Sequence, residues 1–264
     1  MRPLVEVAPG VLVATAQTWQ TTSTVVVADG GCLVVDPAVT VAEVDGLAGA
    51  LAARGTRVEA GFATHPHWDH VLWSTGLGDV PRWATAEACR IVQDGREALL
   101  RDAEADAPGH DPGLIGRLTP LPDEGATVPW SGPRTVVVPH RAHCPGSAAL
   151  VVPERRVLCA GDLLSDREVP LLDLDVPDPV GEHLRALDLL EAALDEHAVR
   201  VVVPGHGTVT DPSGARRRAD ADRAYLSALV SGAPVVDGRL DDPWVAAQHE
   251  RQAIWASGGR EPAP

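Results

Sequence analysis

The segment THPHWDH at residues 64–70 constrains this chain more than any other stretch. It places three imidazoles and a carboxylate directly after the apolar run at residues 58–63. Such a run predicts a strand that delivers the polar residues to the edge of a sheet. Along an extended segment alternate side chains point the same way, so His65 and His67 can converge on one metal ion. Asp69 and His70 lie beyond a turn and can face a second ion, and a solvated polar loop is the minor alternative.

The composition describes an acidic, soluble globular protein. Lys and Arg number 22 against 37 Asp and Glu, which gives a formal net charge of -15 over 264 residues. Because phosphate binding rests on clustered Lys and Arg, this charge disfavours nucleic acid and anionic membranes as partners. We therefore expect a small-molecule substrate as the partner, and the oligomeric state stays open.

The cysteines and the N-terminus indicate the compartment. Cys32, Cys89, Cys144 and Cys159 are scattered without CxxC spacing, which is typical of reduced, mostly buried thiols. No signal-peptide pattern and no run of 18 apolar residues occurs in the chain. The predicted location is cytoplasmic.

The order of the predicted elements is that of an α/β protein in one domain, residues 1–264, with a helical C-terminal portion at about 211–257. Turn residues separate the first short β-type runs, which predicts an antiparallel meander. The predicted strands are 4–7, 11–14, 24–27, 32–35, 58–63, 135–138, 148–152, 157–160 and 201–203. The predicted helices are 40–53, a first turn at 71–73, 85–105, 180–197, 213–231 and 242–256, with a frayed tail at 258–264.

Three more ligand candidates follow strands elsewhere in the chain. His143 follows the predicted strand at 135–138, Asp162 ends the strand at 157–160, and His206 follows the strand at 201–203. Strand ends are where α/β folds place their chemistry, so we expect these residues to join the cluster at residues 65–70.

These motifs together resemble the metallo-β-lactamase superfamily, whose signature is HxHxDH followed by three distant single ligands. HPHWDH at residues 65–70 matches the first motif in full. HCPGS at 143–147, AGDLL at 160–164 and PGHG at 204–207 resemble the later ones. The resemblance covers roughly residues 4–210, and the order and spacing of the motifs are highly specific.

The resemblance implies an αββα four-layer sandwich of two mixed β-sheets with helices outside. It also implies two metal ions per chain, each with its own ligands. The implied ligands are His65, His67 and His143 for one ion, Asp69, His70 and His206 for the other, and Asp162 bridging them. Nitrogen and oxygen ligands without a thiolate suit Zn²⁺, and Fe or Mn is the alternative.

A dinuclear site of this kind predicts hydrolysis. Two divalent ions about 3.5–4 Å apart depress the pKa of water, so that a zinc-bound hydroxide is present at neutral pH. The ions also polarise the substrate carbonyl and stabilise the developing oxyanion. Asp69 has a second expected role as the catalytic residue that orients the hydroxide and passes its proton to the leaving group. The predicted substrate is an ester, thioester or lactone of a small molecule.

Within the superfamily, the metal residues are closer to glyoxalase II and lactonase-type members than to true β-lactamases, because position 162 is an aspartate. The basic residues that glyoxalase II enzymes usually carry near the C-terminus have no counterpart cluster in residues 242–256. The alternatives are β-lactam hydrolysis, a mononuclear-iron persulfide dioxygenase-like oxidoreductase and a non-catalytic scaffold. The complete ligand set disfavours the last two.

Several nearby side chains match no ligand position. We expect His140 to orient a ligand or to be structural, and Cys144 to be a buried spectator thiol, because neighbours on an extended segment point oppositely. Trp68 and Trp73 either pack in the core or line an apolar pocket mouth. The remaining histidines are predicted to be solvated: His110, His183, His197 and His249.

Overall fold

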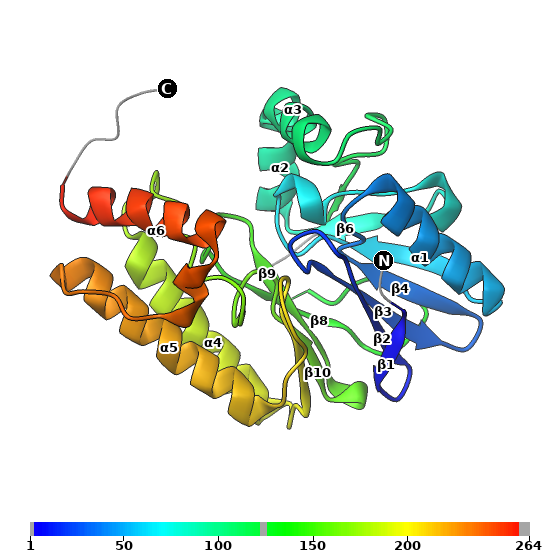
Figure 1. The fold of residues 1–264 in the computed structure, drawn as a ribbon. Helices are drawn as coiled ribbons and strands as arrows, with labels where there is room; N and C mark the ends of the chain where they lie inside the picture. Colours follow the sequence, from blue (N-terminus) through cyan, green and yellow to red (C-terminus); the bar gives the residue numbers. More distant parts are fainter. Residues whose placement is uncertain (1–2, 122–125, 259–264) are drawn as a thin grey trace.

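Two mixed β-sheets face each other at the centre of the protein in a computed structural model, which describes residues 3–121 and 126–258 (Figure 1). The larger sheet has the order β1-β2-β3-β4-β5-β6-β7. Its strands are β1 (Val5–Ala8), β2 (Val11–Thr15), β3 (Thr22–Ala28), β4 (Gly31–Val35), β5 (Arg57–Phe62), β6 (Arg82–Ala84) and β7 (Thr119–Pro120). The first four strands pair antiparallel, which confirms the predicted meander, and β4 to β7 pair parallel.

The smaller sheet has the order β11-β10-β9-β8. Its strands are β8 (Val136–Pro139), β9 (Ala148–Val152), β10 (Val157–Cys159) and β11 (Val201–Val203). β8, β9 and β10 pair antiparallel, whereas β10 and β11 are parallel.

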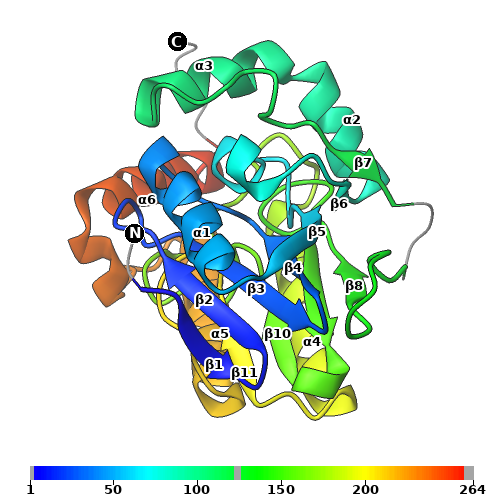
Figure 2. The same cartoon turned by 90° about the vertical axis from the view of Figure 1, so that its right-hand side faces the viewer.

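Helices cover the outer face of each sheet. They are α1 (Val41–Ala53), α2 (Ala86–Asp94), α3 (Arg96–Asp106), α4 (Pro179–Glu196), α5 (Pro212–Ser231) and α6 (Pro243–Ala256). Short 3-10 turns lie at η1 (Trp68–His70), η2 (Thr75–Leu77), η3 (Pro153–Arg155) and η4 (Gly238–Asp241). Seen from the side, α1 lies in front of the sheets and α4 and α5 lie behind them (Figure 2). The predicted αββα sandwich is therefore confirmed.

Burial on both faces of the strands accounts for their continuous apolar sequences. Every residue of β4 (GCLVV) and β9 (AALVV) is buried, since one face meets the opposite sheet and the other meets a helix. Leu33 and Leu150 pack in the core between the sheets. Leu47 of α1 and Leu187 of α4 pack in the two outer cores. Thr40 caps α1 in a capping box with Glu43.

The structure corrects three details of the sequence-based assignment. The predicted helical turn at 71–73 is irregular, and the turn at this place is the short 3-10 turn at Trp68–His70, which ends before Val71. The single helix predicted for 85–105 is two helices that meet at Gly95. The sequence does not predict β6 and β7, since these strands are too short to show an alternating pattern. The tail at 259–264 lies outside the described residues.

Parallel pairing brings the carboxyl ends of four strands to one edge of the sandwich. Backbone hydrogen bonds tie the two sheets together there: the Ala148 amide donates to the Thr64 carbonyl (2.8 Å), and the Thr22 amide donates to the Gly205 carbonyl (2.7 Å). Residues that directly follow β4, β5, β10 and β11 therefore meet at this edge. No helix in the described part of the chain is long and apolar enough to cross a bilayer.

Candidate metal centre

The seven predicted ligand residues all meet at this edge of the sandwich. His65 and His67 follow β5, Asp69 and His70 lie in η1, His143 lies between β8 and β9, Asp162 follows β10, and His206 follows β11. Their ligand atoms form two groups, each within 4.8 Å. The groups are His65, His67, His143 and Asp162, and Asp69, His70 and His206.

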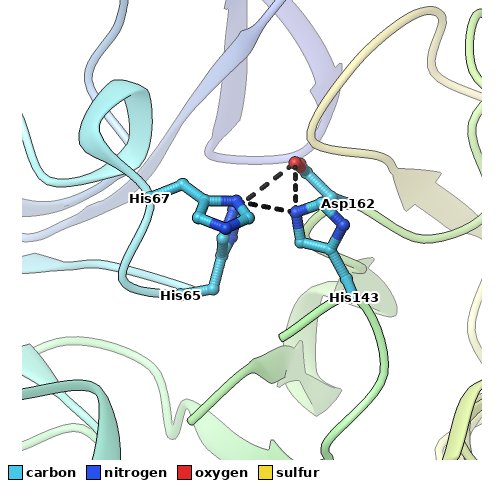
Figure 3. A group of neighbouring side chains, drawn as sticks. All are labelled: His65, His67, His143 and Asp162. Atoms are coloured by element: carbon cyan, nitrogen blue, oxygen red, sulfur yellow. Dashed lines mark hydrogen bonds and ion pairs between the residues drawn. The ribbon is translucent and has the colours of Figure 1, made fainter. Parts of the chain in front are cut away.

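The first group surrounds a single point (Figure 3). His143 Nε2 lies 2.8 Å from His67 Nδ1 and 3.3 Å from Asp162 Oδ2. His65 Nε2 lies 3.4 Å from the same Asp162 oxygen. His67 is exposed to the adjoining cavity, whereas His65 is buried.

The second group repeats the same spacing. Asp69 Oδ2 lies 3.3 Å from His70 Nε2 and 3.5 Å from His206 Nε2, and the two imidazole nitrogens are 3.4 Å apart. Asp162 reaches this group as well, with Oδ1 at 3.2 Å from His70 Nε2 and Oδ2 at 3.3 Å from His206 Nε2. One carboxylate therefore connects the two groups.

The donor set fits a pair of metal ions. Nitrogen and oxygen ligands about 2.0–2.1 Å from a tetrahedral Zn²⁺ lie roughly 3.3 Å from one another. Most of the separations in both groups lie near this value. Among the described residues, His65 Nε2 and Asp162 Oδ1 are also buried without a hydrogen-bond partner. Buried polar atoms are rarely left unpaired, so both are arranged for a ligand other than a protein group.

Hydrogen bonds donated by Nδ1–H hold four of the imidazoles with Nε2 toward the site. His65 bonds through Nδ1 to Thr64 Oγ1 (3.0 Å), and His143 bonds through Nδ1 to the Leu171 carbonyl (3.2 Å). His206 bonds in the same way to the Trp19 carbonyl (3.2 Å). This arrangement fixes the tautomer that leaves Nε2 free to bind a metal.

Asp36 supports the fourth imidazole, and its role was not predicted from the sequence. Its Oδ2 accepts a hydrogen bond from His70 Nδ1 (3.0 Å) and from the Thr64 hydroxyl (2.6 Å), while Oδ1 accepts from the Thr64 amide (2.8 Å). Since the Thr64 hydroxyl donates to Asp36, it accepts from His65, so one carboxylate orients both histidines. The only sequence signal was its place, directly after a buried strand.

The candidate ligand histidines differ in the direction of their pKa shifts. Burial lowers the pKa of His65 to about 3, so this imidazole is neutral and ready to bind a metal. Burial also lowers the pKa of His206, but Asp162 and Glu168 outweigh it and raise the pKa to about 10. Burial raises the pKa of Asp162, but His70 and His206 outweigh it and hold the pKa well below its usual value. Protons therefore compete with metal ions for the second group.

The other candidate side chains have mixed outcomes. Cys144 is a buried free thiol whose Sγ lies 3.3 Å from Ser147 Oγ, and burial raises its pKa to about 12, as expected of a spectator. Trp73 packs in the core and donates to the Gly78 carbonyl (2.9 Å), whereas Trp68 both packs and lines the cavity beside the candidate metal centre.

Two histidines predicted to be solvated are buried instead. His110 bonds through Nε2 to the Val39 carbonyl (2.8 Å). His183 is buried in α4, and neither of its ring nitrogens has a hydrogen-bond partner among the described residues. The sequence contained this signal, because His183 stands four residues before Leu187 and seven before Leu190, on the apolar face of the helix.

The comparisons with known proteins agree with this geometry. The sequence profile of the Metallo-beta-lactamase superfamily matches residues 16–206, and the chain belongs to that superfamily. No curated protein matches the chain. The subtype within the superfamily, glyoxalase II-like or other, is not assigned by these matches.

Solved structures share the fold at low sequence identity. A metallo-beta-lactamase family protein from Thermus thermophilus is 22% identical with a TM-score of 0.68, and the match covers 97% of both chains. A beta-lactamase domain protein from Burkholderia ambifaria is 20% identical with a TM-score of 0.66, over 97% of this chain and 89% of that one. A metallo-beta-lactamase from Pontibacter korlensis is 16% identical with a TM-score of 0.61, over 83% and 97%.

Proposed function

We propose that the protein is a metal-dependent hydrolase that cleaves an ester, thioester or lactone of a small molecule at a dinuclear zinc site. The observation that carries the proposal is the position of Asp162, whose carboxylate oxygens lie 3.2–3.4 Å from four imidazole nitrogens of the two groups. A carboxylate placed in this way is suited to bridge two cations.

We assign the seven residues of the two groups as ligands of two metal ions. When bound, two divalent ions would supply Lewis-acid polarisation of the scissile carbonyl and lower the pKa of water. His65, His67 and His143 would hold one ion. Asp69, His70 and His206 would hold the other.

Asp69 has a second proposed role as a proton carrier. It lines the cavity, and its Oδ2 lies 3.3 Å from His70 Nε2 and 3.5 Å from His206 Nε2. Burial raises the pKa of Asp69, but His70 and His206 outweigh it and hold the pKa below its usual value, so the carboxylate is ionised. An ionised carboxylate at the cavity wall can orient the attacking water and return a proton to the leaving group.

The test is a substrate panel with zinc-loaded protein: acyl thioesters, lactones, aryl esters and a chromogenic cephalosporin. We expect hydrolysis of at least one ester-type class, its loss in His65→Ala, and its retention in the matched control His197→Ala at the end of α4. Hydrolysis of the cephalosporin alone would favour β-lactam hydrolysis instead. A protein with two bound zinc ions that hydrolyses none of the panel would contradict the proposal.

A further inference from the structure

A cavity of about 300 Å³ opens beside the metal centre and is built largely from tryptophan and acidic side chains. Besides the candidate ligands, its lining residues are Trp19, Trp68, Asp106, Glu168, Leu171, Trp244 and Gln248. Neither Lys nor Arg is among the described residues that line it. Its composition therefore differs from a cavity made for an anion.

Three tryptophans from distant parts of the chain form one continuous wall of this cavity. The ring centroids of Trp19 and Trp68 are 5.5 Å apart in an edge-to-face arrangement. Those of Trp19 and Trp244 are 6.4 Å apart and stacked. Trp19 and Trp244 are 37% and 43% exposed, so a ligand can reach both rings. The face of an indole ring attracts a cation within about 6 Å of its centroid.

The tryptophan wall is connected to the candidate metal centre by a hydrogen bond and by the sequence. The carbonyl of Trp19 accepts the hydrogen bond from His206 Nδ1, so the residue that carries the central ring also orients a candidate ligand. Trp68 lies in the sequence between His67 and Asp69. The wall and the candidate ligands line one cavity, so a molecule bound against the wall would also lie beside the candidate metal centre.

The charges around the wall also favour a cation. Asp106 is the last residue of α3 and lines the cavity, and the C-terminal end of a helix carries partial negative charge. The opposing N-terminus of α6 is neutralised locally, because the Asp242 carboxylate accepts from the amides of Trp244 and Val245. Two divalent ions would bring four positive charges, and Asp69 and Asp162 would offset two of them. The remaining positive charge would repel a cation from the ions, so a cationic group fits the tryptophan wall instead.

We propose that this cavity selects substrates that carry an alkylammonium group, which lies against Trp19 and Trp244 and faces Asp106 while the scissile carbonyl points to the metal centre. The orientation of the substrate rests on the proposed hydrolase function, whereas the binding of the ammonium group does not. Substrates whose non-reacting part bears carboxylates would place a negative charge beside Asp106 and would be disfavoured.

A matched pair of probes tests the binding step without any reaction. Choline and its uncharged analogue 3,3-dimethylbutan-1-ol have the same shape and the same hydroxyl, so their difference isolates the positive charge. We expect calorimetry on the zinc-loaded full chain to show choline bound about tenfold more tightly. Equal binding of the two probes, or binding of neither, would overturn the proposal.

Variants locate the binding group. Trp244→Leu and Asp106→Asn should each reduce the preference for choline several-fold, whereas Trp244→Phe should retain part of it. The matched controls are Trp255→Leu in the same helix and Asp102→Asn one turn earlier in α3, and neither residue lines the cavity. A preference unchanged in both Trp244→Leu and Asp106→Asn would also overturn the proposal.

Hydrolysis of acetylthiocholine and S-(3,3-dimethylbutyl) thioacetate separates this inference from the proposed function. Choline binding without hydrolysis of either thioester would support the cation site and count against a thioesterase. Hydrolysis of both thioesters at equal kcat/KM, together with equal binding of the two alcohols, would support the hydrolase and overturn the cation site.

Discussion

Replacement of Asp36 tests how far the fold itself prepares the metal centre. The carboxylate is buried and accepts three hydrogen bonds, from the Thr64 amide, the Thr64 hydroxyl and His70 Nδ1. Asp36→Ala leaves these three donors without that partner, at about 1–3 kcal/mol for each buried group. The backbone at this position has a φ of 47°, a conformation that disfavours Ala by a further 1 kcal/mol or so. Since such losses are not fully additive, we expect the free energy of unfolding to fall by about 3–5 kcal/mol.

The same substitution should weaken one metal position more than the other. Without Asp36, His70 loses the bond that holds its Nε2 toward Asp69 and His206, and removal of such a supporting group typically lowers metal affinity about 10–100-fold. Because Asp36 reaches His65 only through Thr64, a zinc titration against a fluorescent chelator should show both equivalents weakened, the one held by His70 more than the one held by His65.

Asp36→Asn is the matched control, because asparagine tolerates the positive φ and its carbonyl oxygen can still accept from Thr64. It should recover much of the stability, but the NH₂ group that replaces Oδ2 only donates, so it cannot accept from the Thr64 hydroxyl or from His70 Nδ1. The reasoning is refuted if Asp36→Ala binds two equivalents of zinc as tightly as the unmodified protein, or if its unfolding free energy is unchanged.

Three other predictions concern catalysis, pH dependence and packing. Asp69→Ala should lower turnover of the best panel substrate by about 10²-fold or more, and His140→Ala by less than about tenfold, in steady-state assays. Burial lowers the pKa of His183 to about 3, so the unfolded chain binds the extra proton below about pH 6.5 and stability falls as pH falls toward 3. In urea unfolding, His183→Gln should flatten this fall by up to about 1.4 kcal/mol per pH unit. Gly146→Ala should lose at least about 2 kcal/mol in the same assay, because φ is +84° and a Cβ would lie 2.6 Å from the Ala88 amide nitrogen.

Each of these three predictions can be contradicted by a specific result or checked with a control. Equal losses of turnover in Asp69→Ala and His140→Ala would mean that the proton-carrier role is wrong. A stability profile of His183→Gln parallel to that of the unmodified protein would show that this imidazole is solvated after all. Gly78 has a similar φ of +88° but only Val80 Cγ1 near its virtual Cβ, at 3.8 Å, so Gly78→Ala should lose less than Gly146→Ala.

The sequence was sufficient to predict which candidate ligand residues lie together, because their arrangement depends on strand order. His65, Asp162 and His206 each follow a strand, and the parallel pairing of β4 with β5 and of β10 with β11 brings those ends together. Spacing within HPHWDH and burial of the strands are local properties, so both are visible in the chain.

What could not be predicted depends on contacts between distant segments. Asp36 supports His70 across 34 residues, and Trp244 stacks on Trp19 because α6 packs beside α5 and η4. No local pattern records either contact. The break at Gly95 and the strand at β6 were missed for a different reason, since each involves too few residues for periodicity to show.

Metal content tests the central claim most directly. The full chain, purified without chelator and analysed by inductively coupled plasma mass spectrometry, is predicted to hold about two divalent ions per chain, zinc foremost. Asp162→Ala is predicted to lower that number because it removes the carboxylate shared by both groups. One iron per chain in the purified protein, or two tightly held ions in Asp162→Ala, would contradict a carboxylate-bridged dinuclear centre.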